Sequence, residues 1–207
     1  MFYTIEEGPL ARGLQHNPVN ALVAPRPIGW VSTVDLLGRV NLAPFSYFNL
    51  VSADPPVVVF APNDKDCQGV AKDSLRNVRE TGEFVVNIVP WQLRFAMNLT
   101  SAELAHGENE YLTAGVTQAK SVLVKPPRVN ESPAALECKV YQIVALPRRR
   151  GGRRSHAVFG EVVGVHIDDM VIEDGMVNTL KIAPTARLGA FEYSGIDRIE
   201  VIPRPRA

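Results

Sequence analysis

The 207-residue sequence is poor in the residues that form disulfides and metal sites. Its two cysteines, Cys67 and Cys138, lie far apart and outside any CxxC pair. This usage is typical of reduced thiols in a cytoplasmic protein. The four histidines are His16, His106, His156 and His166. Their positions show no metal-ligand spacing, so we expect no metal site.

The sequence also lacks a net charge, because 22 Lys and Arg residues balance 22 Asp and Glu residues. A neutral chain gives no reason to expect nucleic acid or an anionic membrane as the main partner, and little self-repulsion opposes self-association. No apolar run approaches the roughly 18 residues of a membrane span. The acidic N-terminus lacks the order of a secretion signal. We therefore expect one soluble, cytoplasmic domain over residues 1–207.

Strand patterns joined by short turns dominate what is present. We expect strands at 19–34 with a proline-marked bend, then at 39–48, 57–61, 83–89, 135–146, 155–167 and 198–202. Short helical segments are expected at 72–82, capped by Asp73 or Ser74 and ended by Gly82, and at 90–99. Residues 107–133 are expected to form a long surface excursion. Hairpin-length connections between the strands favour an antiparallel barrel or sandwich.

The apolar stretch 39–60 is interrupted by small or polar residues. Pro44 cannot donate to a sheet ladder, so the strand that contains it is an edge strand or is bulged there. The stretch therefore has two interpretations. It is either an irregular core strand, or one wall of a slot for a flat heteroaromatic ligand, with freed backbone groups at the polar rim and with Phe45, Tyr47 and Phe48 against the ring.

A possible phosphate site follows one strand later. The expected helix start presents unpaired N–H groups and the positive end of the helix dipole. Lys72, Ser74 and Asn77 are suitable companions for a phosphate there, although most helix starts bind nothing but their own cap. A slot for a ring together with a phosphate site would suit FMN.

Several motifs together resemble a known family. They are "PRPIGWVST", "GRVNLAPFSYFNLVSADPPVVVF", "KDSLRNVRETGEFVVNIV", "SPAALECKVYQIV", "SHAVFGEVVGVHIDD" and "IAPTARLG". In order and spacing they resemble the flavin reductase-like domain, in the branch of the nitrilotriacetate monooxygenase reductase component and flavoredoxin. The resemblance covers about residues 18–193, which it implies to be the core of the domain. It implies a mainly β, Greek-key split barrel of the FMN-binding type. It also implies a homodimer with the flavin near the subunit interface.

The resemblance assigns the candidate cofactor-binding residues. It implies that the isoalloxazine rim of FMN contacts the backbone of Ala43, Pro44, Phe45, Ser46, Tyr47 and Phe48, with Trp30 and Ser32 nearby. It implies that the ribityl and phosphate end of FMN is bound by Asn63, Lys72, Asp73, Ser74 and Asn77. Arg187 is either a ligand of a phosphate or partner subunit, or one half of a surface salt bridge. His156 is either an active-site contact or a structural histidine, and His166 is interpreted as structural.

The run of arginines from Arg148 to Arg154 is interpreted first as a solvated hairpin tip. The alternatives are a site for the extra phosphate of NADPH, for an acidic partner protein or for nucleic acid. The implied activity is hydride transfer from NADH or NADPH to FMN, with reduced flavin passed to a partner monooxygenase or its electrons to a redox partner. An electron carrier with permanently bound FMN and a flavoenzyme for another small substrate are the alternatives. Hydride transfer needs no acid–base residue, which agrees with the lack of a catalytic triad.

Overall fold

The computed structural model describes residues 1–105 and 107–205. Its strands are β1 (Arg26–Pro27), β2 (Gly29–Val34), β3 (Val40–Phe45), β4 (Phe48–Ala53), β5 (Pro56–Phe60), β6 (Glu83–Ile88), β7 (Gln118–Ala119), β8 (Arg128–Val129), β9 (Ala134–Ala145), β10 (His156–Ile167), β11 (Ile172–Glu173), β12 (Met176–Val177), β13 (Ala186–Arg187) and β14 (Tyr193–Ser194). The α-helices are α1 (Val19–Leu22), α2 (Asp73–Thr81), α3 (Arg94–Leu99), α4 (Glu110–Ala114) and α5 (Thr179–Ile182). Single 3₁₀ turns lie at Pro9–Arg12, Trp91–Leu93 and Asp169–Val171.

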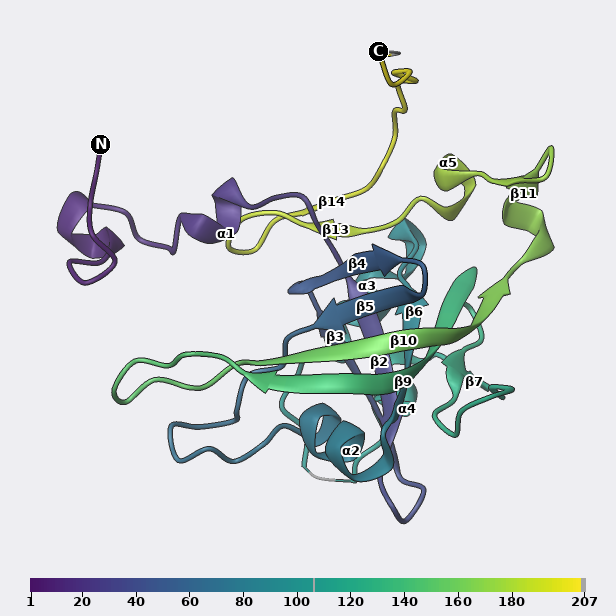
Figure 1. The fold of residues 1–207 in the computed structure, drawn as a ribbon, viewed down its shortest axis with the longest axis horizontal. Helices are drawn as coiled ribbons and strands as arrows, with labels where there is room; N and C mark the ends of the chain where they lie inside the picture. Colours follow the sequence, from purple (N-terminus) through teal and green to yellow (C-terminus); the bar gives the residue numbers. More distant parts are fainter. Residues whose placement is uncertain (106, 206–207) are drawn as a thin grey trace.

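Seven antiparallel strands form the main sheet in the order β3-β2-β6-β9-β10-β5-β4 (Figure 1). The outermost strands, β3 and β4, are consecutive in the chain and only Ser46 and Tyr47 join them. The two ends of the sheet must therefore lie close together, which curls it into a barrel. No pairing between β3 and β4 is present among the described strands. The barrel is thus split along a seam between these two strands.

Alternate residues of nearly every strand point into the barrel and form its main core. Phe45, Phe60 and Phe84 pack in a row, with ring centroids 5.0 and 5.1 Å apart. Helix α2 adds Leu75 and Val78 to this core, and both side chains are buried. Because successive strand residues alternate between faces, the remaining residues of the same strands form a second, outer surface.

The outer surface of β2 and β6 is covered by the segment that follows β6. Trp30 is fully buried there with Leu42, Met97 and Tyr111. The Ser32 hydroxyl donates to the backbone carbonyl of Pro127 over 2.5 Å. Residues 107–133 are therefore not the surface excursion expected from their glycines and polar residues. They hold a helix, two short strands and several fully buried side chains.

The long strands, the β2–β3 hairpin and helix α2 agree with the sequence predictions, as does the end of α2 at Gly82, whose φ is 69°. Four local predictions are wrong. The strand expected at 39–48 ends at Phe45, and a new strand, β4, begins at Phe48. Helix α1 replaces the first strand expected within 19–34, and residues 198–202 form no strand. Helix α2 begins after Lys72 with no side-chain cap, because the Ser74 hydroxyl instead pairs with Asn41.

Both terminal segments extend beyond the barrel (Figure 1). Strands β1, β13 and β14 form a separate small sheet that joins the N-terminal and C-terminal parts of the chain. Helix α2 lies on the opposite side of the β9–β10 hairpin from this small sheet (Figure 1). The connection between β9 and β10 projects far from the barrel.

Candidate functional site

Strand β3 presents an open edge with an unusual set of backbone groups. The Leu42 N–H donates to the Glu110 carboxylate over 3.0 Å, so it points away from the neighbouring strand β2. Backbone groups two residues apart point the same way, so the nitrogen of Pro44 also faces the open edge. Pro44 therefore removes no hydrogen bond from the sheet. The strand is an edge strand, as its proline predicts, and its register with β2 is continuous, without a bulge.

A cavity of about 430 Å³ lies along this edge. Ligand cavities in proteins measure about 300–1,000 Å³. Strand β3 contributes one wall, the beginning of α2 another, and the segment after α3 the third. The lining residues are Asn41, Ala43, Pro44, Phe45, Lys65, Lys72, Asp73, Thr100, Ser101, Ala102, Glu103, Leu104, Ala105 and Glu110.

The cavity joins the two regions that the sequence singled out. Phe45 is buried and lines it from β3, while Lys72 and Asp73 line it from the start of α2. Asp73 forms ion pairs with Lys65, at 3.3 Å, and with Arg76. No carboxylate of the described residues lies within salt-bridge distance of the Lys72 ammonium. Lys72 thus carries a positive charge into the cavity beside the first N–H groups of the helix.

Ser74 and Asn77 are behind the cavity wall. Both side chains are 2% exposed and have partners inside the protein. The Asn41 amide and the Ser74 hydroxyl form a hydrogen bond of 2.9 Å, and Asn77 donates to Thr33 over 3.0 Å. Neither residue lines the cavity. Asp73 therefore faces the site, while Ser74 in the same turn and Asn77 one turn later face the core.

Trp30 and Ser32 also point away from the cavity, on the outer face of β2. The Trp30 N–H donates to the Thr100 hydroxyl over 2.9 Å. Since Thr100 lines the cavity, Trp30 contacts the candidate site only through this hydrogen bond. Ser32 has no such link, because its hydroxyl is used to hold Pro127.

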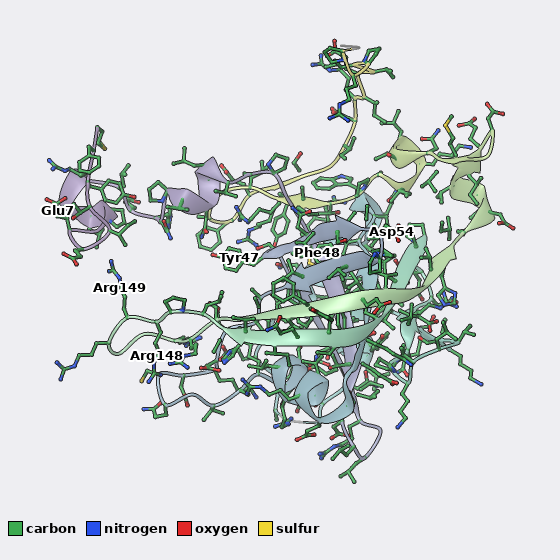
Figure 2. All side chains as sticks on the ribbon, viewed as in Figure 1. Glu7, Tyr47, Phe48, Asp54, Arg148 and Arg149 are labelled. Atoms are coloured by element: carbon green, nitrogen blue, oxygen red, sulfur yellow. The ribbon has the colours of Figure 1, made fainter. Side chains whose placement is uncertain are left out.

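The candidate residues that directly follow Phe45 do not line the cavity; they are Ser46, Tyr47 and Phe48. The Tyr47 hydroxyl donates to Asn20 over 2.9 Å, and its carbonyl accepts from the Ala61 N–H over 2.9 Å. Phe48 packs on Gly29, where a Cβ atom would come within 2.8 Å of its ring. Figure 2 shows both aromatic side chains beside β4, at the side of the sheet that faces the terminal segments. The seam turn is half-exposed at Ser46.

His156 lies at the start of β10 and is buried, with 5% of its surface exposed. Its backbone N–H donates to the Pro62 carbonyl, and its Nδ1 lies 3.7 Å from Asp64. Burial, together with the charges of Arg79 and Arg154, lowers the pKa of His156. Asn63 is next to this group and accepts from the Ser155 hydroxyl over 2.5 Å. Neither His156 nor Asn63 reaches the cavity lining.

The remaining basic candidates lie elsewhere. Arg187 donates to the Tyr193 hydroxyl and to the Ala190 carbonyl, and it stacks on the Tyr193 ring at 4.5 Å. Figure 2 shows Arg148 and Arg149 on the projecting β9–β10 connection. Arg148 donates to the backbone carbonyl of Cys67, and Arg149 to that of Ile5. None of these arginines lines the cavity.

Sequence reasoning missed the third wall, which runs from Thr100 to Ala105 and includes Glu110. Glu110 is 8% exposed, and burial together with the nearby charges of Asp73 and Glu108 raises its pKa. The only sequence signal was the length of the segment, since long ordered connections are often functional. Nothing in its composition indicated a buried carboxylate at the site.

Comparison with known proteins decides the family. The flavin reductase like domain matches residues 23–181. The chain belongs to the flavin reductase-like domain family. Three solved structures are similar to it and support the split-barrel fold. Component B of nitrilotriacetate monooxygenase from Bacillus cereus is 28% identical, with a TM-score of 0.88 and 98% of each chain covered.

The second is the 2-nitrobenzoate 2-nitroreductase of Pseudomonas fluorescens, 26% identical with a TM-score of 0.83, covering 99% of this chain and 96% of the other. The third is the flavoredoxin of Desulfovibrio vulgaris, 20% identical with a TM-score of 0.72, covering 87% and 91%. At that identity the third supports the fold alone. The family makes this chain a flavin-related oxidoreductase with a mainly β split barrel.

No helix within residues 1–105 and 107–205 has the length and apolarity needed to cross a membrane. No three histidine, cysteine, aspartate or glutamate side chains in this part of the chain are grouped as metal ligands would be.

Proposed function

We propose that this flavin reductase-like protein binds FMN in the cavity along β3 and uses NADH or NADPH to reduce it. The observation that carries the proposal is that one cavity joins the open edge of β3 to the start of α2. The edge offers backbone carbonyl groups for the polar rim of a flat ring, with Phe45 as apolar surface. The helix start offers N–H groups and the Lys72 ammonium for a phosphate.

The residues present fit such a cofactor in size and in chemistry. A cavity of about 430 Å³ is large enough to enclose much of a flavin nucleotide. When bound, FMN supplies the hydride-accepting chemistry. The protein would orient the ring along β3, hold the phosphate with Lys72 and the first turn of α2, and exclude water with the wall from Thr100 to Ala105. Hydride transfer to a flavin held in this way needs no acid–base group at the reacting atoms.

Association with other proteins is part of the proposal. Strands β4, β9 and β10 carry exposed apolar side chains on the outside of the barrel, among them Leu50 at 57%, Tyr141 at 73% and Val165 at 58% exposure. Together with the absence of net charge, these favour a homodimer. Since the similar protein of Bacillus cereus is a monooxygenase component, we propose a monooxygenase as the recipient of reduced flavin. Sedimentation velocity at micromolar protein would test the dimer.

The first experiment is the visible spectrum of the purified protein with FMN, before and after anaerobic addition of NADH or NADPH. Rapid bleaching of bound flavin supports the reductase and identifies its nucleotide. Bound flavin that stays oxidised contradicts the reductase and favours an electron carrier. Because the similar protein of Pseudomonas fluorescens is a nitroreductase, a nitroaromatic acid should be tested in the same cell for a flavoenzyme of that kind.

Lys72→Ala tests the cofactor assignment. Loss of a hydrogen bond from a charged group costs about 1.5–3 kcal/mol, so the Kd for FMN should rise about tenfold to a hundredfold. Lys120→Ala is the matched control, because Lys120 is exposed and lines a different cavity. Fluorescence titration measures both. An unchanged Kd in Lys72→Ala would contradict the assignment of the phosphate to the start of α2.

A further inference from the structure

Glu110 is a buried carboxylate in the wall of the cavity, and the proposed binding of FMN gives it no role. It begins α4, and one of its oxygens accepts from the Leu42 N–H on the open edge of β3. Its other oxygen lies beside the amide of Asn41, which also lines the cavity and is 8% exposed. Asn41 in turn contacts the Ser74 hydroxyl in the first turn of α2. A continuous polar chain therefore joins the cavity wall to the helix start.

Two orientations of the Asn41 amide fit the same atom positions, and in the first of them the amide nitrogen also faces the Leu42 N–H, which is another donor. In one, its nitrogen donates to Ser74 over 2.9 Å and its oxygen faces Glu110. In the other, its nitrogen donates to Glu110 over 3.3 Å and its oxygen accepts from the Ser74 hydroxyl over 2.9 Å and from the Leu42 N–H over 3.2 Å. An ionised carboxylate only accepts, so it requires the second orientation. A protonated carboxyl can donate to the amide oxygen, so it stabilises the first.

The charges around Glu110 disfavour a second anion in the cavity. Burial and the negative charges of Asp73 and Glu108 raise the pKa of Glu110. The cavity is lined by two cations, Lys65 and Lys72, and by three carboxylates, Asp73, Glu103 and Glu110, and Arg76 behind the lining is paired with Asp73. Arg39 lies with Asp73 and Glu108 in a small neighbouring cavity and is paired with Asp35. A phosphate that entered this lining would repel the Glu110 carboxylate.

We propose that Glu110 takes up a proton when an anionic flavin nucleotide binds in the cavity, and that Asn41 turns its amide to accept the new hydrogen bond. Protonation removes one negative charge from the lining. It also favours the orientation in which the Asn41 N–H faces the Ser74 hydroxyl, in the first turn of α2. This inference rests on the proposed binding of FMN. It predicts that the affinity for the nucleotide falls as pH rises from the pKa of Glu110 in the free protein to its higher pKa in the complex.

The experiment is isothermal titration calorimetry of FMN into the full-length protein, in buffers of different ionisation enthalpy, from pH 5.5 to 8.5. The variant is Glu110→Gln, whose amide can still accept from Leu42 and donate to Asn41 but cannot titrate. The control is Glu103→Gln, which removes an exposed carboxylate from the same lining and leaves the polar chain intact. Any proton taken up by the FMN phosphate itself is common to all three proteins.

The wild type and Glu103→Gln should take up about one proton more per FMN than Glu110→Gln within the sensitive pH range. Their Kd should rise by up to about tenfold per pH unit relative to that of Glu110→Gln. Infrared difference spectra should show a protonated carboxyl on binding in the wild type and in Glu103→Gln but not in Glu110→Gln, and the wild-type spectrum tests the inference even if the variant folds poorly. Equal proton uptake in all three proteins, or no protonated carboxyl in wild type, would overturn it while FMN binding still stood. Absence of FMN binding would overturn the proposed function as well.

Discussion

Glu110 and Glu137 are both buried carboxylates, but their surroundings differ in the number of donors. Glu137, on β9, accepts from the N–H groups of Val122, Leu123 and Val124, at 2.7, 2.5 and 3.2 Å, and pairs with His166 at 2.5 Å. Burial opposes its ionisation, but these hydrogen bonds outweigh burial and lower its pKa. Glu110 accepts from one backbone N–H and faces Asp73, and its pKa is raised.

The comparison separates a structural carboxylate from a functional one. Glu137 anchors the segment 122–124 to the outer face of the barrel, and its ionised form is the one that the structure stabilises. The neighbours of Glu110 stabilise its ionised form less than burial destabilises that form. This carboxyl can therefore change its protonation state at a ligand site. The interpretation of His166 as structural agrees with its contact with Glu137.

The largest expected effect is the loss of stability in Glu137→Ala. Removing the shared acceptor leaves three backbone N–H groups and His166 without their partner, which should lower the free energy of unfolding by about 3–5 kcal/mol. Glu110→Ala deprives one backbone N–H of its partner and should cost about 1–2 kcal/mol. Urea unfolding at pH 7 measures both. Equal losses would break the distinction between the two carboxylates.

Glu137→Gln should show the pH dependence of a carboxyl with a lowered pKa. In the folded protein this group binds its proton less readily than in the unfolded chain. Its stabilisation is therefore present above the unfolded pKa of about 4.3 and is lost as pH falls through the folded pKa. The variant should be about 1–3 kcal/mol less stable than wild type at pH 7 and should approach it below pH 4. A difference that stayed constant with pH would contradict the role of the ionised form.

Glu110→Gln should show the opposite sign. A raised pKa means that the folded protein binds the proton more tightly, so the ionised carboxylate lowers stability as pH rises above the unfolded pKa. The variant should be more stable than wild type at pH 8, by an amount of the order of 1 kcal/mol, and should converge with it in acid. Thermal unfolding across pH 4–8 measures this. A variant less stable than wild type at pH 8 would place Glu110 with the structural carboxylates.

Glu83→Gln provides the smallest effect and a third point for the comparison. Glu83 begins β6 and is half-buried. It accepts the N–H of Lys125, the residue after segment 122–124, over 3.0 Å. An exposed hydrogen bond of this kind contributes little, so stability should change by no more than about 0.5 kcal/mol at any pH. Urea unfolding beside Glu137→Gln measures it. A loss as large as that of Glu137→Gln would show that the segment, rather than the number of donors, decides the cost.

The parts of the site that are continuous in the chain were predictable. The edge position of β3 followed from Pro44, whose missing N–H cannot serve a central strand. The helix at 73–81 and its end at Gly82 followed from its apolar spacing and the glycine. Lys72 and Phe45 were placed at the cavity on the same grounds, together with the resemblance to the family. Local rules act over a few residues, so the sequence is enough to apply them.

The parts that depend on distant contacts were not predictable in this way. Ser74 and Asn77 looked like ligands because they follow a helix start, but the packing of α2 on the barrel turned them inward. The short strand expected at 198–202 finds no partner in the structure, and an unpaired strand is not stable alone.

The sequence by itself determined the long strands, helix α2, and the two stretches that meet at the cavity, because periodicity and turn chemistry are local properties. Only the tertiary structure decided that Glu110 faces this cavity while Glu137 anchors a segment. It also decided that the Trp30 N–H donates to Thr100 in the cavity wall. Both carboxylates are the same residue type in the chain. Their different roles arise from which backbone donors and charges the fold brings within a few ångströms of each, which no local pattern records.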